Sequence, residues 1–292
     1  MSNKFTISYA GLDADDHALD MRKFGDALVG LDKVISAGLI AVADFREPKK
    51  GERFPLRIRA REPEEGTFHI VGELVPVAHG LYVSVLPIVH EVFHKKAGEI
   101  AWAWVSWVLK MAGGREHEAD PHFTALMELT KEIHRGRIES EEANRRFLLE
   151  VLDRVLPQAR HVVAPVGTSA DTLTIWPGTP DEKTDQATEV DVPSAEAIRS
   201  KEKLKVGDME TFIVRVDGII HHARQLKIEH PTEAGKYLTA QVRDPAFDDP
   251  SGVYMKAVAS QGLLEVSAKP SRKEDGSLQA LYILDARLPA TS

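Results

Sequence analysis

The chain has 292 residues, enough for two domains, and its 43% hydrophobic and 28% charged residues are typical of a globular protein. A formal net charge of -8 argues against a surface built throughout for nucleic acid. The absence of cysteine excludes disulfides, thiolate metal sites and cysteine nucleophiles. Residues 1–17 lack an apolar run with a cleavage site, so we expect no signal peptide and a cytoplasmic protein.

The N-terminal part is predicted to form a β-α-β-β unit. Residues 4–10 alternate in polarity, as a strand does. The acidic stretch 13–16 offers N-cap chemistry, rather than a metal site, to a long helix with one broad apolar face. Residues 54–62 and 66–77 are typical of two strands joined by a Pro-Glu-Glu-Gly turn.

A set of helices follows this unit. Pro87 suits the first turn of one helix, and residues 99–111 form an apolar stretch that ends at a Gly-Gly pair. Pro121 and Ser140 suit the starts of two more helices. We therefore expect an α+β domain with a helical bundle over residues 1–177.

The C-terminal part differs in composition. Residues 178–208 are polar, charged and poor in aromatic side chains, so we predict a linker, with a short helix near 194–204. Short β-rich stretches then follow, separated by Gly, Pro and Asp, and the Glu-Asp-Gly turn at 274–276 indicates a hairpin. One of the predicted strands is the stretch 253–259. Residues 209–292 are therefore predicted to form a small antiparallel β-barrel or sheet of SH3-like or OB-like size.

The spacing His90-Glu91-x-x-His94 matches a zinc-peptidase helix, in which two histidines bind Zn²⁺ and the glutamate acts as general base. The third ligand would come from the following acidic loop, with Glu118 as our choice among Glu116, His117, Glu118, Asp120 and His122. Two lysines follow His94 directly, and the longer zincin pattern does not continue. We therefore favour a solvated helix surface without metal or other cofactor, and keep a zinc-dependent hydrolase as the alternative.

The segment IAWAWVSWVL (100–109) is apolar on every side, which predicts burial. It is shorter than the ~20 apolar residues that a membrane-spanning helix needs. We expect either a core helix or an oligomer interface formed by Trp102, Trp104 and Trp107. A membrane-disrupting effector acting through residues 81–112 is a further alternative, although membrane contact is not favoured.

A basic face on the β-domain could bind nucleic acid, through residues such as His221, His222, Arg224, Lys227 and His230. Residues 206–292 contain ten Lys or Arg against twelve Asp or Glu, however, and few aromatic residues for stacking. Nucleic acid is therefore a possible partner but not the favoured one.

The stretches ISYAGLDADDHALDMRKFGDALVGLDKVI (7–35), PLRIRAREPEEGTFHIV (55–71) and GLLEVSAKPSRKEDGSLQALYILDARL (262–288) resemble an uncharacterised bacterial protein family. The resemblance implies a two-part architecture, no established activity and an association with mobile-element or antiviral defence contexts. We therefore expect a non-enzymatic binding or oligomerising protein, with a second copy or another protein as partner and the β-domain as the contacting part.

Overall fold

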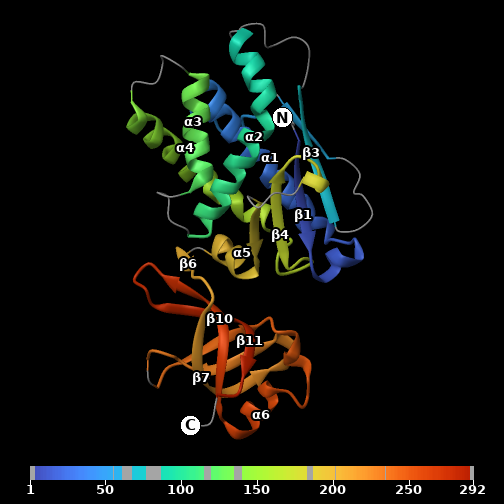
Figure 1. The fold of residues 1–292 in the computed structure, drawn as a ribbon, viewed down its shortest axis with the longest axis vertical. Helices are drawn as coiled ribbons and strands as arrows, with labels where there is room; N and C mark the ends of the chain where they lie inside the picture. Colours follow the sequence, from blue (N-terminus) through green and yellow to red (C-terminus); the bar gives the residue numbers. More distant parts are fainter. Residues whose placement is uncertain are drawn as a thin grey trace. The chain divides into compact units, whose positions relative to one another are not determined.

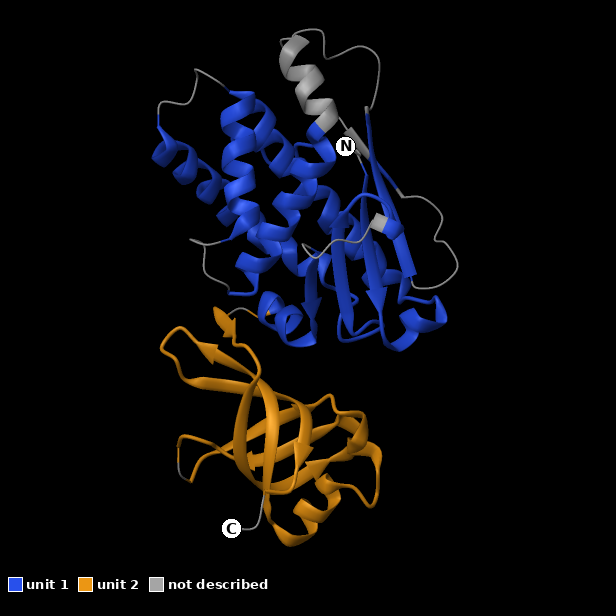
Figure 2. Ribbon diagram, in the orientation of Figure 1, with its two compact units in different colours: residues 1–199 blue, residues 200–292 orange. Residues whose placement is uncertain are grey.

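The computed structural model describes residues 4–54, 56–60, 68–76, 87–114, 120–134, 140–182, 187–200, 202–233 and 235–289. The chain divides into two compact units, residues 1–199 and 200–292 (Figure 2). The first unit combines a sheet with helices, and the second is a small β-barrel with one α-helix of its own (Figure 1). The predicted α+β class is confirmed.

The first unit is built on a five-stranded antiparallel sheet of order β2-β3-β1-β4-β5. Its strands are β1 (Lys4–Ala10), β2 (Leu56–Ala60), β3 (Phe68–Pro76), β4 (Thr172–Pro177) and β5 (Thr188–Asp191). In the central strand, Ile7 lies opposite Ile70 of β3 and Ile175 of β4, so three buried isoleucines form one row across the sheet. The predicted β-α-β-β order is present, and β4 and β5 extend the sheet beyond β1.

The helices of this unit are α1 (Met21–Asp44), α2 (Pro87–Ala112), α3 (Pro121–Ile133), α4 (Glu141–Val162) and α5 (Val192–Arg199). Ser140 caps α4 as predicted, by accepting a hydrogen bond from the backbone N–H of Ala143. The N-cap of α1 is Asp20, whereas the acidic stretch before it forms the short 3-10 helix η1 (Leu12–Asp16). The prediction that this stretch caps α1 was therefore wrong by one turn.

Two glycines let α1 approach its neighbours closely. A Cβ placed on Gly38 would lie 2.3 Å from Cγ of Trp104 in α2. A Cβ on Gly30 would lie 2.7 Å from Cβ of His161 in α4. Helix α1 therefore packs on both helices at positions where any larger residue would have to displace a neighbour.

The predicted linker is wrong over residues 188–199, which form β5 and α5 within the first unit, and over residues 204–206, which form a strand of the second. The short helix predicted near 194–204 is present as α5, which begins and ends earlier. Thr188 and Val190 point into the core while Glu189 is exposed, so a charged edge strand resembled a linker in composition. The carboxylate of Asp191 caps α5, and Arg199 at its end donates to the backbone carbonyls of Val163 and Val166. The segment therefore covers the C-terminal end of α4.

The second unit is a closed five-stranded barrel. Its strands β7 (Glu210–Ile220), β8 (Gln225–Glu229), β9 (Tyr237–Val242), β10 (Leu263–Lys273) and β11 (Leu278–Arg287) follow the ring order β7-β8-β9-β11-β10. Strands β9 and β11 are parallel, and β6 (Leu204–Val206) pairs with β10. Along the chain, helix α6 (Val253–Ser260) follows the third barrel strand, β9, and precedes the fourth, β10, as in an OB-fold.

Residues 253–259 were predicted to be a strand, and that prediction was wrong. They belong to α6, where Tyr254 and Ala257 are buried three residues apart on one helical face. Seven residues are too few for the helical period to stand out from β-favouring side chains such as Val253 and Val258.

Candidate functional site

The three tryptophans of α2 lie inside the first unit. Trp104 and Trp107 are 0% exposed and Trp102 is 7% exposed. Trp107 stacks on Phe123 at 4.8 Å between ring centroids, and Trp104 meets Trp107 edge-on at 5.4 Å. Their own chain already covers these indoles, so they form core and have no free surface for a subunit interface. Of the two alternatives predicted for them, a core helix or an oligomer interface, their burial supports the core helix.

A buried polar cluster joins the end of α2 to the start of α3. The Lys110 ammonium lies 3.2 Å from the Asp120 carboxylate, which caps α3 by accepting from the N–H of His122. Burial, followed by the nearby Lys110 charge, lowers the pKa of His122 to about 4, although Asp120 opposes the change. Its Nε2 lies 3.4 Å from the hydroxyl of Thr188. The positive Lys110 lies in the last turn of α2 and the negative Asp120 at the start of α3, where the helix dipole favours each charge. The cluster therefore stabilises the connection between these two helices.

The predicted zinc site falls outside the described part of the chain. The backbone of residues 90–94 lies in α2, which begins at Pro87 as predicted, but the side chains of His90, Glu91 and His94 are not described, and Glu118 is not described at all. Among the residues the structure describes, no three His, Asp or Glu side chains group as metal ligands. The zinc alternative therefore stays a prediction.

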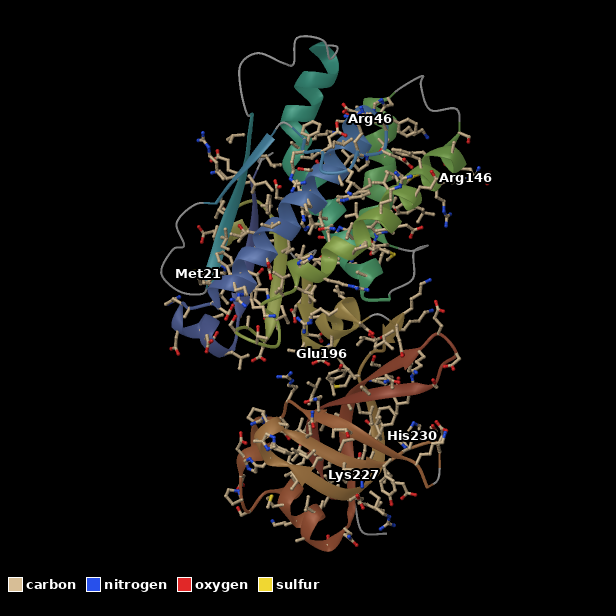
Figure 3. The ribbon with its side chains drawn as sticks, turned by 180° about the vertical axis from the view of Figure 1, so that it is seen from behind. Met21, Arg46, Arg146, Glu196, Lys227 and His230 are labelled. Carbon is tan, nitrogen blue, oxygen red and sulfur yellow. The ribbon has the colours of Figure 1, made fainter. Side chains whose placement is uncertain are left out.

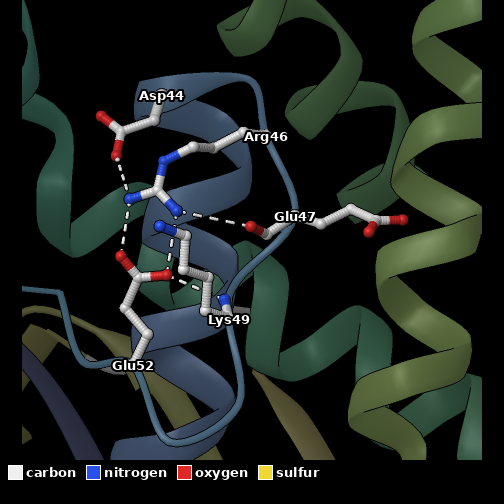
Figure 4. A network of polar contacts seen from close by, with 5 residues as sticks. All are labelled: Asp44, Arg46, Glu47, Lys49 and Glu52. Carbon is white, nitrogen blue, oxygen red and sulfur yellow. Dashed lines mark hydrogen bonds and ion pairs between the residues drawn. The ribbon is translucent and has the colours of Figure 1, made fainter.

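The turn after α1 contains a dense polar network (Figure 4). Arg46 pairs with Glu52 at 2.8 Å and with Asp44 at 3.1 Å, and Glu52 also accepts from the backbone N–H of Lys49 at 2.8 Å. The hydrogen bond from Arg46 lowers the pKa of Glu52 to about 2, with help from the Lys49 N–H. Arg154 of α4 pairs with Glu47 at 2.6 Å. These contacts fix the path of the chain from α1 toward β2.

In the barrel, Arg224 of the predicted basic face is used for contacts within the unit. Arg224 donates to the backbone carbonyls of Val242 and Asp244, pairs with Asp248, and lies over the ring of Phe247 at 5.2 Å. Asp244 in turn accepts from the hydroxyl of Tyr254 at 2.7 Å. The guanidinium therefore ties the β7–β8 turn to the segment after β9 and is not available as a free cation.

One row of outward-facing residues crosses four strands of the barrel. Leu263 of β10 lies opposite Arg215 of β7, and Glu229 of β8 lies opposite Tyr237 of β9. Arg215 and Glu229 join the two halves through an ion pair of 3.7 Å. Leu263 and Tyr237 therefore lie at the two ends of a row ~14 Å long.

Ile213 and Lys227 lie beside this row. Ile213 is the next outward residue of β7, opposite Glu265. Lys227 of β8, labelled in Figure 3, pairs with Asp217 at 2.6 Å and lies over the ring of Tyr237 at 4.6 Å. We call the set Ile213, Arg215, Lys227, Glu229, Tyr237 and Leu263 the outer face of the barrel.

The outer face exposes large apolar side chains. Ile213 is 60% exposed, Tyr237 55% and Leu263 41%. Sequence reasoning missed this surface, because alternation along β7 and β10 shows that one side of each strand is outward but does not show which strands pair. Only the register brings residues 213, 237 and 263 to one face.

The comparisons with known proteins agree with this two-part architecture. Residues 5–199 match the family model described as a domain of unknown function (DUF7946). The chain belongs to that family. Residues 208–287 are similar to a second family of unknown function (DUF7947), and no curated protein matches. The expected resemblance to a family without an established activity is confirmed.

Among solved structures, the chain is similar to a mutant of the ferredoxin protease FusC in complex with Arabidopsis ferredoxin. The sequence identity is 9% and the TM-score is 0.21, over 82% of this chain and 29% of that chain. The chain thus spans less than a third of that protein, and a TM-score this low carries no argument about fold or activity. Within the described residues, no helix is long and apolar enough to cross a membrane.

Proposed function

We propose that the chain is a non-enzymatic binding protein that associates with a second copy of itself through the outer face of the barrel. The observation that supports this most is the exposure of Ile213, Tyr237 and Leu263 on one face of the sheet. Large apolar side chains gathered on one surface are typical of protein interfaces, and Tyr and Arg are enriched in them.

The charges of the outer face favour a protein over nucleic acid. Arg215 and Lys227 are each paired with a carboxylate, Glu229 and Asp217 respectively. The face therefore has no excess of positive charge to attract phosphates. Its exposed aromatic ring, Tyr237, is already covered on one side by Lys227, which leaves less of it for stacking on a base.

A second copy suits this face because each of its two cations lies beside a carboxylate, Arg215 beside Glu229 and Lys227 beside the neighbouring Asp217. In a two-fold contact the same patch meets itself, so each cation of one copy can approach an anion of the other. The apolar ends of the row would then be covered by the partner.

The lack of cysteine supports action in the cytoplasm, and the family resemblance is the sole support for a role in mobile-element or antiviral defence systems.

Sedimentation velocity on the full chain, over a wide range of concentration, tests the proposal. We expect concentration-dependent association that Ile213→Lys weakens by about tenfold or more, as burial of an unpaired charge in an interface does. Ile220→Lys is the matched control, because Ile220 is the same residue type near the other end of β7 and is 40% exposed. A chain that stays monomeric throughout, or equal effects of both variants, would overturn the proposal.

A further inference from the structure

The first half of α1 has an exposed apolar stripe. Met21, labelled in Figure 3, is 88% exposed, the largest exposed fraction among the exposed large hydrophobic residues of the described chain, and Val29 is 53% exposed. These residues lie eight positions apart, with Gly25 halfway between them, and therefore share one side of the helix. A Cβ placed on Gly25 meets nothing within 4 Å, so the helix backbone is open to approach at this point.

Charges of opposite sign border the stripe. Arg22 and Asp26 are both exposed and lie one turn apart on the same flank. Within the described residues, neither forms an ion pair, unlike the next acidic residue of α1, Asp32, which pairs with Arg53 at 2.5 Å. Among the described residues, this flank thus presents one cation and one anion without an ion-pair partner next to the apolar stripe.

We propose that the first half of α1 forms a second contact between copies, in which two α1 helices pack antiparallel around a two-fold axis at Gly25. Met21 then lies against the partner's Val29, and Val29 against the partner's Met21. A rotation about this axis keeps each flank on the same side, so Arg22 faces the partner's Asp26 and Asp26 faces the partner's Arg22. Arg22 and the partner's Asp26 are offset by ~3 Å along the helix axes, a distance that an arginine side chain spans.

A second copy is the occupant that this surface fits, because the pattern is complementary to itself. The apolar residues lie at equal distances on either side of Gly25, and the two charges of the flank are opposite in sign, so one rotation pairs all of them at once. The glycine brings the helix backbones close at the axis, where any side chain would hold them apart. A protein of unrelated sequence would have to match this spacing by coincidence.

This inference rests on the proposed self-association and extends it to a surface on the other unit. Two different two-fold contacts on one chain join each copy to two others, which produces either an open series of chains or a closed ring. The wild-type protein is therefore expected to form species larger than a dimer, and each contact can be removed without the other.

Charge exchange on α1 tests the inference in full-length protein that carries Ile213→Lys, which removes the barrel contact. We expect this background to form a dimer by sedimentation velocity. Arg22→Asp places like charges together at two symmetric points and should weaken the dimer by about tenfold or more. Adding Asp26→Arg exchanges the signs and should restore it, and thermal unfolding of each variant checks that the change in association is not a loss of helix stability.

The outcomes separate the two proposals. If the Ile213→Lys protein is already monomeric at every concentration, or if the exchanged pair Arg22→Asp with Asp26→Arg fails to restore association, the α1 contact is overturned. If Ile213→Lys changes nothing while Arg22→Asp abolishes all association, the α1 contact stands and the barrel contact fails. Gly25→Ala adds a further check, because it should weaken association without destabilising the monomer.

Discussion

Replacing Gly38 by alanine is expected to destabilise the first unit, although alanine normally stabilises a helix. The new Cβ would lie 2.3 Å from Cγ of Trp104, whereas carbon atoms in contact are normally ~3.5 Å or more apart. Trp104 is 0% exposed and packed against Trp107, so it cannot move aside without disturbing the core. Overpacking of this kind costs up to about 3 kcal/mol, and the gain in helix propensity returns less than 1 kcal/mol.

The expected net loss is about 2 kcal/mol, which corresponds to a fall of roughly 4–8 °C in Tm for a unit of this size. Urea unfolding followed by tryptophan fluorescence measures it. Gly25→Ala is the matched control on the same helix, since its Cβ has open space, and it should raise stability by ~0.5–1 kcal/mol at concentrations where the chain is monomeric. Trp104→Leu should make Gly38→Ala nearly neutral. If Gly38→Ala proves as stable as Gly25→Ala, the close packing of α1 on α2 is wrong.

Three further predictions concern charge and metal. Because the pKa of His122 is lowered to about 4 from 6.5, the unfolded chain binds a proton that the folded chain does not, and stability should fall by up to ~3 kcal/mol as the pH drops from 6.5 to 4. Urea unfolding at a series of pH values should show this loss in the wild type and not in His122→Gln; identical profiles would contradict it. Glu52 has the pKa lowered to about 2, so its pairing with Arg46 stabilises the fold above pH 4.5 and is lost toward pH 2. Glu52→Gln should therefore cost about 1 kcal/mol at neutral pH and almost nothing at pH 2, as measured by thermal unfolding, since the pair is partly open to water. Finally, dialysis against EDTA should leave Tm unchanged, and one zinc per chain by elemental analysis would instead support the hydrolase alternative through His90 and His94.

Long, regular elements were predictable from the sequence. The apolar face of α1, the proline at the start of α2 and the serine cap of α4 all carry local signals that tertiary packing did not overrule. The elements that were missed lack such signals. Strand β5 buries only alternate residues, and α6 has eight residues with β-favouring side chains.

The candidate surfaces were harder to predict than the fold. An isoleucine at position 213 or a valine at position 29 looks the same in sequence whether it is buried or exposed. For the tryptophans two alternatives stayed open, core helix or oligomer interface, since an apolar helix indicates burial but not what covers it; their burial supports the core. Register in the barrel and the packing side of α1 decide these questions, and both are set by contacts between distant parts of the chain.

The place of β1 in the sheet has a consequence for synthesis on the ribosome. This strand is made before the other strands of its sheet, yet one of its two neighbours, β4, begins only at Thr172. Similarly, the hydroxyl of Thr6 donates a hydrogen bond to the carbonyl of Gly178, which is made 172 residues later. Strand β1 can pair with β3 much earlier, but its other edge must stay unpaired while the helices are made. The nascent chain thus carries an open, apolar strand edge through most of the synthesis of its first unit, a period in which two neighbouring nascent chains could pair wrongly.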